Sequence, residues 1–387
     1  MTTKNILIVA NTASMIKLFN MQNIKILKKL GCRVIVATNF INPGTISQNS
    51  VRELKDELNK LGAKFYQVNF LRRLGNIKQN YAAYKKLCLI IKNENIDLVH
   101  THAPLSSIIA RQAAHKTGVR CIYTSHGFQF YPHAPLKNWL IYYPIEYWFS
   151  HYTDAIITIN SDDYLVAKKM KANHVYYIPG VGTNVIRAQK LVKSGMKQSL
   201  RQETRKKLGL TKDDFMLLSI GELSKRKNHE TVIRAIAKLK NPHLKYFIAG
   251  IGPEHDHLLK LAKDLGVADQ FFLLGFKKNV TKLYSAADLN CFLSVREGLG
   301  MGGLEGVNLG LYILATKYTG AKDYVTSTKT GILLNHPTNV NEVASAIARV
   351  VNQRLVAVPD YQFLKSFDYK NVNQEMQKIY QQELAKL

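Results

Sequence analysis

The chain has 387 residues, of which 46% are apolar, and a formal net charge of +27. This length suits two domains rather than one hydrophobic core, and the apolar fraction excludes a disordered chain. The basic excess is spread over both halves, which favours polyanionic partners such as nucleic acid, an anionic membrane or phosphorylated substrates. Charge alone does not choose among these three, and a solvated basic surface is a further explanation.

Nothing in the sequence predicts export or a membrane-spanning helix. The apolar run near the N-terminus is too short for a signal peptide, and the most apolar segment, residues 139–149, is interrupted by Pro144 and Glu146. The four cysteines have neither metal-ligand nor redox spacing, and three of them lie in apolar runs (Cys32, Cys88, Cys121 and Cys291). We therefore expect a cytoplasmic protein with reduced cysteines.

Short runs rich in Ile, Val and Leu alternate with longer amphipathic segments along the first half of the chain. This alternation is typical of a parallel sheet covered by helices. The predicted strands are residues 5–10, 33–37, 64–68, 98–101, 120–124 and 155–159. Helical patterns fill most of the gaps between them.

The alternation begins again after the turn-rich segment IPGVGT, residues 178–183. The strands predicted there are residues 216–220, 246–249, 271–274, 289–293, 312–315 and 331–333. Residues 187–212 hold nine Lys and Arg against one acid, and the last segment has helical apolar spacing. The prediction is an N-terminal domain (1–180), a C-terminal domain (181–367) and a final helix (368–387) that packs back toward the N-terminal domain.

The predicted fold class is α/β, with two tandem Rossmann-like doubly wound domains facing a cleft. In such sheets ligands bind beyond the carboxyl ends of the strands, so candidate site residues should follow strands directly. In the first domain Asn11, His102, His126 and Gly127 follow predicted strands. A histidine is more often structural than catalytic, and a strand end raises the case for His126. His102 could face the cleft or simply finish a core strand.

Two loops of the second domain follow strands in the same way. Gly221 opens a loop that carries Arg226 and Lys227, where adjacent cations would neutralise a diphosphate. The turn AGIGPE brings Gly252 to the end of the next strand. A charged loop is equally often plain solvated surface.

The segment SVREGLGMGGLEG, residues 294–306, follows a strand and precedes a predicted helix from about 303 to 309. Glycines at such a turn allow a close approach of the backbone to a phosphate or a sugar. The segment also satisfies the dinucleotide pattern G-x-G-x-x-G, although that pattern usually opens the first unit of a domain. A pair of hydrolytic carboxylates, Glu297 and Glu305, and a merely flexible connection are further interpretations.

The order of these motifs resembles that of the retaining glycosyltransferases of family 4, which have the two-domain GT-B fold. EGLGMGGLE resembles the E-x7-E signature of that family. The likeness covers nearly the whole chain, through the HG pair at 126 and 127, the Lys227 loop, AGIGPE and the run AADLNCFLS. The blocks HGFQFYPHAPLKNWLIYYPIEYW, LVHTH and IPGVGT resemble the bacterial subgroup that builds capsular and exopolysaccharide repeat units.

The resemblance implies a nucleotide sugar bound mainly by the second domain and an acceptor that enters from the first. Glu305 would accept hydrogen bonds from the ribose, and Glu297 would hold the donor sugar. Lys227, with Arg226, would offset charge on the departing diphosphate, and His126 would contact the donor sugar. The remaining donor-binding positions are Gly221, Gly298, Gly300, Met301 and Gly302.

The chain departs from the family pattern at several positions. Family members commonly have Pro at the position of Gly300, a small residue such as Ala at Gly306 and Arg at Glu222. The extra glycines predict a looser loop, and Glu222 removes one of the usual cations. These departures put the strength of donor binding in doubt. No D-x-D sequence occurs, so no obligatory metal or other cofactor is expected.

The sequence therefore predicts a transferase of a hexose or N-acetylhexosamine from a nucleotide sugar, UDP-linked, to a lipid-diphosphate-linked oligosaccharide. Its expected partners are that donor, that acceptor and an anionic membrane surface, without nucleic acid. It would be cytoplasmic and peripheral at the inner face of the cell membrane. The aromatic block 139–149 would serve the membrane contact or pack as a core helix. The alternatives are an NAD-dependent oxidoreductase that uses GLGMGG and a basic nucleic-acid-binding protein.

Overall fold

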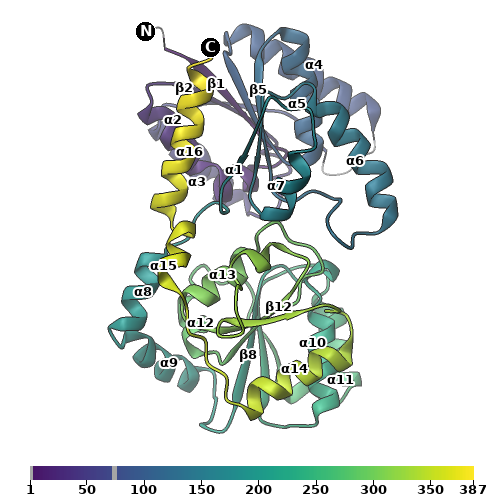
Figure 1. The fold of residues 1–387 in the computed structure, drawn as a ribbon, viewed down its shortest axis with the longest axis vertical. Coiled ribbons are helices and arrows are strands. Elements are labelled where there is room, and N and C mark those ends of the chain that lie inside the picture. The colour runs from purple at the N-terminus through teal and green to yellow at the C-terminus, as the bar shows by residue number, and fades with distance from the viewer. Residues whose placement is uncertain (1–2, 72–75) are drawn as a thin grey trace. The chain divides into compact units, whose positions relative to one another are not determined.

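The computed structural model describes residues 3–71 and 76–387. It divides into two compact units, which are Met1–Val181 with Lys370–Leu387 and, separately, Gly182–Tyr369 (Figure 1). Each unit is a parallel sheet with helices on both faces, so the expected Rossmann-like fold class is confirmed. The chain passes from the first unit to the second within two residues of the expected junction.

The first unit contains a seven-stranded parallel sheet in the order β3-β2-β1-β4-β5-β6-β7. Its strands are β1 (Asn5–Val9), β2 (Arg33–Thr38), β3 (Lys64–Gln67), β4 (Leu98–His102), β5 (Arg120–Ser125), β6 (Ala155–Thr158) and β7 (His174–Tyr177). The central strands are buried on both faces, which explains their continuous apolar runs. The prediction missed β7, because this edge strand is only half-buried and reads HVYY rather than a run of Ile, Val and Leu.

The helices of the first unit cover both faces of this sheet. They are α1 (Ala13–Phe19), α2 (Met21–Lys29), α3 (Gln48–Lys60), α4 (Ile77–Asn93), α5 (Pro104–Thr117), α6 (Leu136–Ser150), α7 (Ser161–Ala167) and α16 (Tyr369–Leu384). Helices α4, α5 and α6 lie on one side, and α1, α2, α3 and α16 lie on the other (Figure 1). Helix α16 is fixed by buried polar contacts, since Tyr380 hydrogen-bonds His100 and Glu383 pairs with Arg120.

Helix α6 has one packed face and one exposed face. Trp139, Tyr143 and their aromatic neighbours pack on a buried cluster that includes Phe128 and Phe130. The opposite face exposes apolar side chains (Leu136, Leu140, Ile141 and Trp148). The aromatic block therefore contributes to the core and also leaves an apolar surface.

The second unit contains a six-stranded parallel sheet in the order β10-β9-β8-β11-β12-β13. Its strands are β8 (Phe215–Ile220), β9 (Leu244–Ala249), β10 (Phe271–Leu273), β11 (Leu289–Phe292), β12 (Tyr312–Thr316) and β13 (Gly331–Leu334). Leu289 pairs with Leu217 on one side and with Tyr312 on the other. The strand order reverses between β8 and β11, which is where ligands bind in doubly wound sheets.

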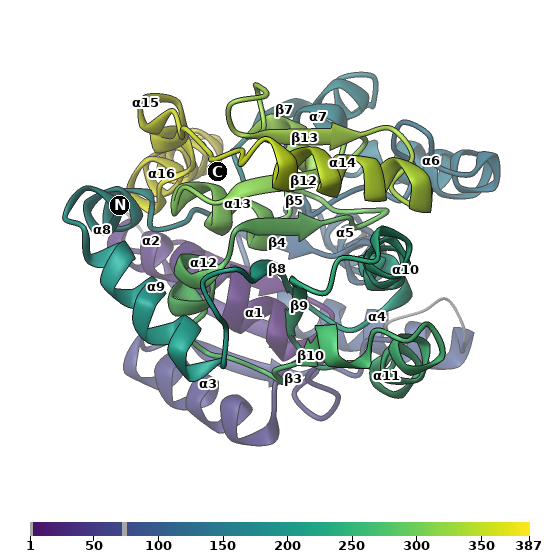
Figure 2. The ribbon, with the colours of Figure 1, turned by 90° about the horizontal axis from the view of Figure 1, so that it is seen from below.

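Two layers of helices cover the second sheet. Helices α10 (His229–Leu239), α11 (His255–Asp264) and α14 (Val340–Asn352) lie on one face, and α9 (Met196–Lys207) and α12 (Thr281–Ala286) lie on the other (Figure 2). The remaining helices are α8 (Val185–Lys193), α13 (Met301–Asn308) and α15 (Tyr361–Leu364), with short 3-10 turns η1 (Lys225–Lys227), η2 (Ala268–Gln270), η3 (Gly320–Asp323) and η4 (Lys365–Phe367). Helix α13 begins two residues before the expected position, because Gly300 ends the preceding loop in a left-handed conformation.

Two sequence expectations concern the whole chain. In residues 3–71 and 76–387, no helix has both the length and the apolar character that a membrane crossing requires. All four cysteines are free, and three of them are buried (Cys32, Cys121 and Cys291). Burial raises the pKa of the Cys121 thiol to about 12, so it stays protonated and unreactive.

Candidate functional site

Three predicted site residues meet where the strand order of the second unit reverses. Lys227 and Arg226 come from the loop after β8, and Glu297 comes from the loop after β11. Glu297 Oε1 accepts from Arg226 at 2.5 Å and lies 2.6 Å from Lys227 Nζ. The sheet therefore brings together two cations and one carboxylate that lie about seventy residues apart in the sequence.

The carboxylate of Glu297 is ionised in this setting. Burial acts to raise its pKa, but the charges of Lys227 and Arg226 outweigh burial and hold the pKa below its ordinary value. Lys227 also lies over the Phe292 ring, with 5.0 Å between Nζ and the ring centroid. Arg226 is shared with Glu222, whose carboxylate lies 3.8 Å away and reduces the local positive charge.

Two glycines beside this cluster leave room for the Lys227 side chain and for the backbone of the Lys227 loop. A Cβ at Gly221 would lie 3.0 Å from Cε of Lys227, so the missing side chain leaves room for the lysine. A Cβ at Gly252 would lie 2.4 Å from the carbonyl oxygen of Leu223. Gly252 therefore has a packing role under the Lys227 loop, and a ligand contact at this position stays a prediction.

The glycine-rich loop 298–302 is held in place by buried side chains. The Tyr284 hydroxyl donates to the carbonyl of Gly302 at 2.6 Å, and the Tyr324 hydroxyl donates to the carbonyl of Gly300 at 3.0 Å. Gly300 has φ +86°, and a Cβ there would lie 2.6 Å from the Phe292 ring.

The expectation that the extra glycines loosen this loop is wrong. Both departures are sterically required, since a Cβ at Gly306 would lie 2.5 Å from the side-chain amide of Asn290. Proline at the position of Gly300 is incompatible with the observed φ, because its ring fixes φ near −65°.

The same loop presents free backbone donors. Within the described parts of the chain, the N–H groups of Gly298, Gly300, Met301 and Gly302 donate no hydrogen bond. Those of Gly303 and the next residue bond back to Gly300 and close the first turn of α13. Unpaired N–H groups before a helix form a site for an anion such as a phosphate.

Glu305 lies apart from Glu297, in a pocket of about 460 Å³. Burial raises the pKa of its carboxyl, and in the described chain this carboxylate makes no hydrogen bond or ion pair. The pocket is lined by residues from four segments of the second unit (Thr183, Asn184, Arg187, Ala188, Leu191, Lys278, Asn279, Val280, Thr281, Tyr284, Glu305, Asn308, Leu309 and Tyr369). A half-buried carboxylate without donors suits a ligand that brings hydroxyl groups.

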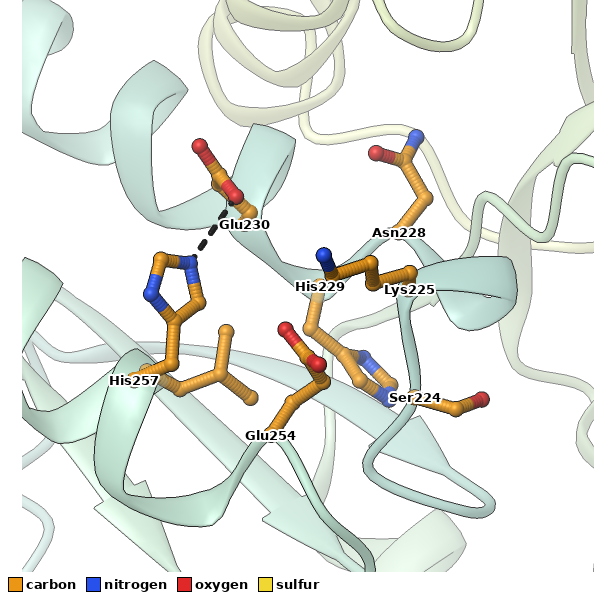
Figure 3. Close-up of a pocket in the computed structure, with 8 residues that line it drawn as sticks. Ser224, Lys225, Asn228, His229, Glu230, Glu254 and His257 are labelled. Carbon is orange, nitrogen blue, oxygen red and sulfur yellow. Dashed lines mark hydrogen bonds and ion pairs between the residues drawn. The ribbon is translucent and has the colours of Figure 1, made fainter.

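A second pocket of about 510 Å³ is lined by residues of the loop after β8 and of α10 and α11, among others. Figure 3 shows His257 beside Glu230, which accepts from it at 3.1 Å, and Glu254 closer to His229. Lys225 and Ser224 complete its rim. Sequence reasoning did not select any of these residues, because charged and polar residues at the ends of helices and in loops give no distinct signal.

Two of the predicted residues of the first unit, His102 and His126, lie side by side. His126 Nε2 lies 3.2 Å from Nδ1 of His102, and burial lowers the pKa of His126 to about 4, so both rings are neutral near pH 7. Gly127 has φ +122° in the following turn, where the Asp163 carboxylate accepts from the next backbone N–H at 3.0 Å. Asn11 follows β1, is half-buried and makes no side-chain hydrogen bond in the described chain.

Metal binding has no support in the described residues. In the described ranges, no three His, Cys, Asp or Glu side chains are placed to hold an ion. The absence of an obligatory metal stays a prediction. Fixed cations at the Lys227 loop could supply the charge that a metal would bring.

Sequence reasoning missed the residues that hold the site together. These are buried or half-buried polar and aromatic side chains (Tyr284, Asn290, Phe292, Tyr324 and His229). Only Phe292, at the end of β11, had a usable signal, because strand ends mark the ligand edge of the sheet. Tyr284, Asn290 and His229 lie inside helices or strands, Tyr324 follows η3, and all four resemble ordinary core residues.

Comparison with known proteins places this geometry in a family. Residues 201–365 match the model for glycosyl transferases group 1, and residues 23–179 match the model for glycosyltransferase family 4. The chain is 34% identical over 339 residues to a putative glycosyltransferase, EpsD, of Bacillus subtilis (strain 168), covering 86% of this chain and 84% of the relative. It is 24% identical over 314 residues to UDP-Gal:alpha-D-GlcNAc-diphosphoundecaprenol alpha-1,3-galactosyltransferase of Escherichia coli, covering 79% of each.

Solved structures agree on the fold. Anabaena HepE in complex with UDP and glucose has a TM-score of 0.74 at 18% identity, covering 97% of this chain and 99% of that one. Sucrose-phosphate synthase from Thermosynechococcus elongatus has a TM-score of 0.75 at 17% identity, covering 99% and 100%. At these identities the likeness shows the fold alone. Together with the EpsD relationship, it shows that the chain belongs to the group 1 and family 4 glycosyltransferases, enzymes with the GT-B fold.

Proposed function

We propose that this enzyme moves a hexose or N-acetylhexosamine from a UDP-sugar to a lipid-diphosphate-linked oligosaccharide, with retention of configuration, during surface polysaccharide synthesis. The EpsD relationship supports the pathway. Two relatives carry diphosphoundecaprenol acceptors in their names, one from Escherichia coli and one from Campylobacter jejuni. The HepE complexes with UDP support the choice of nucleotide.

The observation that carries this proposal is Glu305. Its carboxylate is half-buried in a large pocket and lacks any partner in the described chain, although its helix begins at the loop with free N–H groups. A nucleoside diphosphate fits both features, because its ribose supplies hydroxyl donors and its phosphates supply acceptors. The pocket would hold the nucleoside end, and the loop with Lys227 and Arg226 would hold the diphosphate end.

The transfer step needs charge stabilisation at the leaving group. As the bond from the sugar to the diphosphate breaks, negative charge grows on the phosphate oxygens, which Lys227 and the free N–H groups would offset. The acceptor oxygen bonds to the anomeric carbon on the same face, and its proton passes to the departing phosphate. Glu297 would orient Lys227 and the donor sugar, and the contact of His126 with that sugar stays a prediction.

An acceptor that is anchored in a membrane by its lipid would require the enzyme to contact that membrane. The basic surface and the exposed apolar face of α6 suit such a contact. The only acid in α6, Glu146, is buried and paired with Arg111 at 2.7 Å, so this face carries no acidic charge. An apolar helix face on a basic protein suits peripheral contact with an anionic bilayer. We place the enzyme in the cytoplasm, at the inner face of the cell membrane.

The Glu305→Gln variant tests the nucleoside site with two effects of opposite sign. Burial raises the pKa of Glu305, so its ionised form costs stability at pH above the folded pKa, and this cost disappears as the pH falls. We expect the variant to melt at a higher temperature than the wild type at pH 8, with a smaller gain at acid pH. It should bind UDP about tenfold to a hundredfold more weakly, since hydrogen bonds to a charged group are lost.

Calorimetry with UDP and thermal melting at several pH values would measure both effects. A lower melting temperature together with unchanged UDP affinity would contradict the site. Melting of the wild type with UDP, NAD or duplex DNA separates the alternatives, and stabilisation by NAD without UDP or another nucleoside diphosphate would favour an oxidoreductase. Released-nucleoside-diphosphate assays with a panel of donors would then identify the sugar.

A further inference from the structure

A buried histidine in the second unit contacts the loop that carries the cations. His229 begins α10 and is 5% exposed. Its Nε2 lies 3.2 Å from the carbonyl oxygen of Glu222, and its Nδ1 lies 3.1 Å from the hydroxyl of Tyr246. That hydroxyl lies 2.8 Å from Oγ of Ser219. Three buried side chains thus lie in a row at hydrogen-bond distances, and the row ends on the backbone of loop 221–227.

The neighbours of His229 select one tautomer of its ring. Burial lowers its pKa to about 4, so the ring is neutral near pH 7 and has one ring proton. A carbonyl oxygen only accepts, so this proton belongs on Nε2, which donates to Glu222. Nδ1 is then left to accept from the Tyr246 hydroxyl, while Ser219 Oγ donates its one proton to the carbonyl of Cys291 at 2.6 Å.

The Glu222 peptide lies next to the path of the Lys227 side chain. A Cβ at Gly221, the residue before it, would lie 3.0 Å from Cε and 3.2 Å from Nζ of Lys227. A displaced peptide would therefore change the space that the lysine fills. Lys227 Nζ would move relative to Oε1 of Glu297, which lies 2.6 Å away. A fixed charge at a reacting centre acts through its exact placement.

We propose that His229 is a positioning residue for sugar transfer. Its Nε2–H holds the Glu222 carbonyl and so fixes the path of Lys227, while the Tyr246 hydroxyl donates to Nδ1 of the same tautomer. This inference rests on the proposed function, in which Lys227 offsets charge on the departing nucleoside diphosphate. His229 itself acts from behind the loop, through Glu222.

Two substitutions at this position separate positioning from simple stability. His229→Leu removes the donor and the acceptor, whereas His229→Gln keeps an N–H donor and an oxygen acceptor at similar reach. We expect kcat of the leucine variant to fall about tenfold, with KM for the donor changed less than about threefold. The glutamine variant should recover most of the loss. His243→Leu, at an exposed histidine before β9, is the matched control and should keep wild-type kinetics.

A residue that only stabilised the fold would lower the melting temperature and leave kcat per folded molecule unchanged. Nitrogen NMR of labelled histidine gives a second measurement that needs no turnover. His229 should show a protonated Nε2 at pH 7, and Tyr246→Phe should mainly change its Nδ1 resonance. An Nδ1–H tautomer, or wild-type kcat in His229→Leu, would overturn the proposal. If the wild type transfers no sugar, the proposed function fails, and the tautomer and the effect of His229→Leu on UDP affinity still test the positioning.

Discussion

Lys227 is the residue on which the proposed chemistry depends most. It is mostly buried, lies 2.6 Å from Glu297 and is packed over an aromatic ring, so its charge has a fixed position. A charge fixed in advance stabilises a developing negative charge without reorganisation at the moment of reaction. Arg226 is more exposed and is shared with Glu222, so it cannot take over this role.

The Lys227→Met variant should lose about a hundredfold or more in kcat while remaining folded. Methionine keeps the length of the side chain and removes the charge, so packing against Phe292 is preserved. Lys225→Met is the matched control, since Lys225 is exposed and has no ion pair in the described chain. The turnover of the Lys225→Met variant should stay within about twofold of the wild type. Equal losses in both variants would mean that general charge, rather than this lysine, drives transfer.

At the scale of elements, the loop 294–306 shows what a sequence can and cannot reveal. Its place after β11 and before α13 was predictable, because the strand and helix patterns on either side are distinct. Its rigidity was not, because it comes from Tyr284 and Tyr324, which reach the loop from elsewhere in the chain. Local sequence suggested looseness, and the tertiary contacts impose a single conformation. The same reasoning explains why the support from His229 was missed.

Gly300→Ala tests this rigidity. The loop would hold the alanine at φ +86°, and its methyl group would lie 2.6 Å from the Phe292 ring. We therefore expect a loss of about 2–4 kcal/mol in the free energy of unfolding. Gly209→Ala provides the control, since Gly209 has φ +69° with open space around the missing Cβ. Its cost should be only about 1–2 kcal/mol. Urea denaturation measures the free energy of unfolding of both variants. Equal losses would show that the Phe292 ring moves aside at no cost and that the loop is not held rigidly against it.

At the scale of the whole molecule, the positive charge and the apolar surface of α6 are distributed differently along the chain. The basic excess is spread along the chain, and the first fifty residues contain no acid. The exposed apolar side chains of α6 instead lie close together, on a helix at one edge of the first unit (Figure 1). Electrostatic attraction acts at long range and is screened by salt, whereas apolar insertion is local and insensitive to salt. A membrane contact that uses both should therefore respond to two independent changes.

Sedimentation with anionic liposomes distinguishes these two contributions. Binding of the wild type should fall as salt rises from about 50 mM to 500 mM, because the Debye length shortens from about 14 Å to 4 Å. Replacing Leu140 and Ile141 on α6 with serine should weaken binding at every salt concentration, since about two buried aliphatic side chains are lost. The matched control replaces Val356 and Val358, which are 74% and 65% exposed in the second unit, and should bind like the wild type. Binding that ignores salt would remove the role of charge, and equal binding by both double variants would remove α6 from the contact.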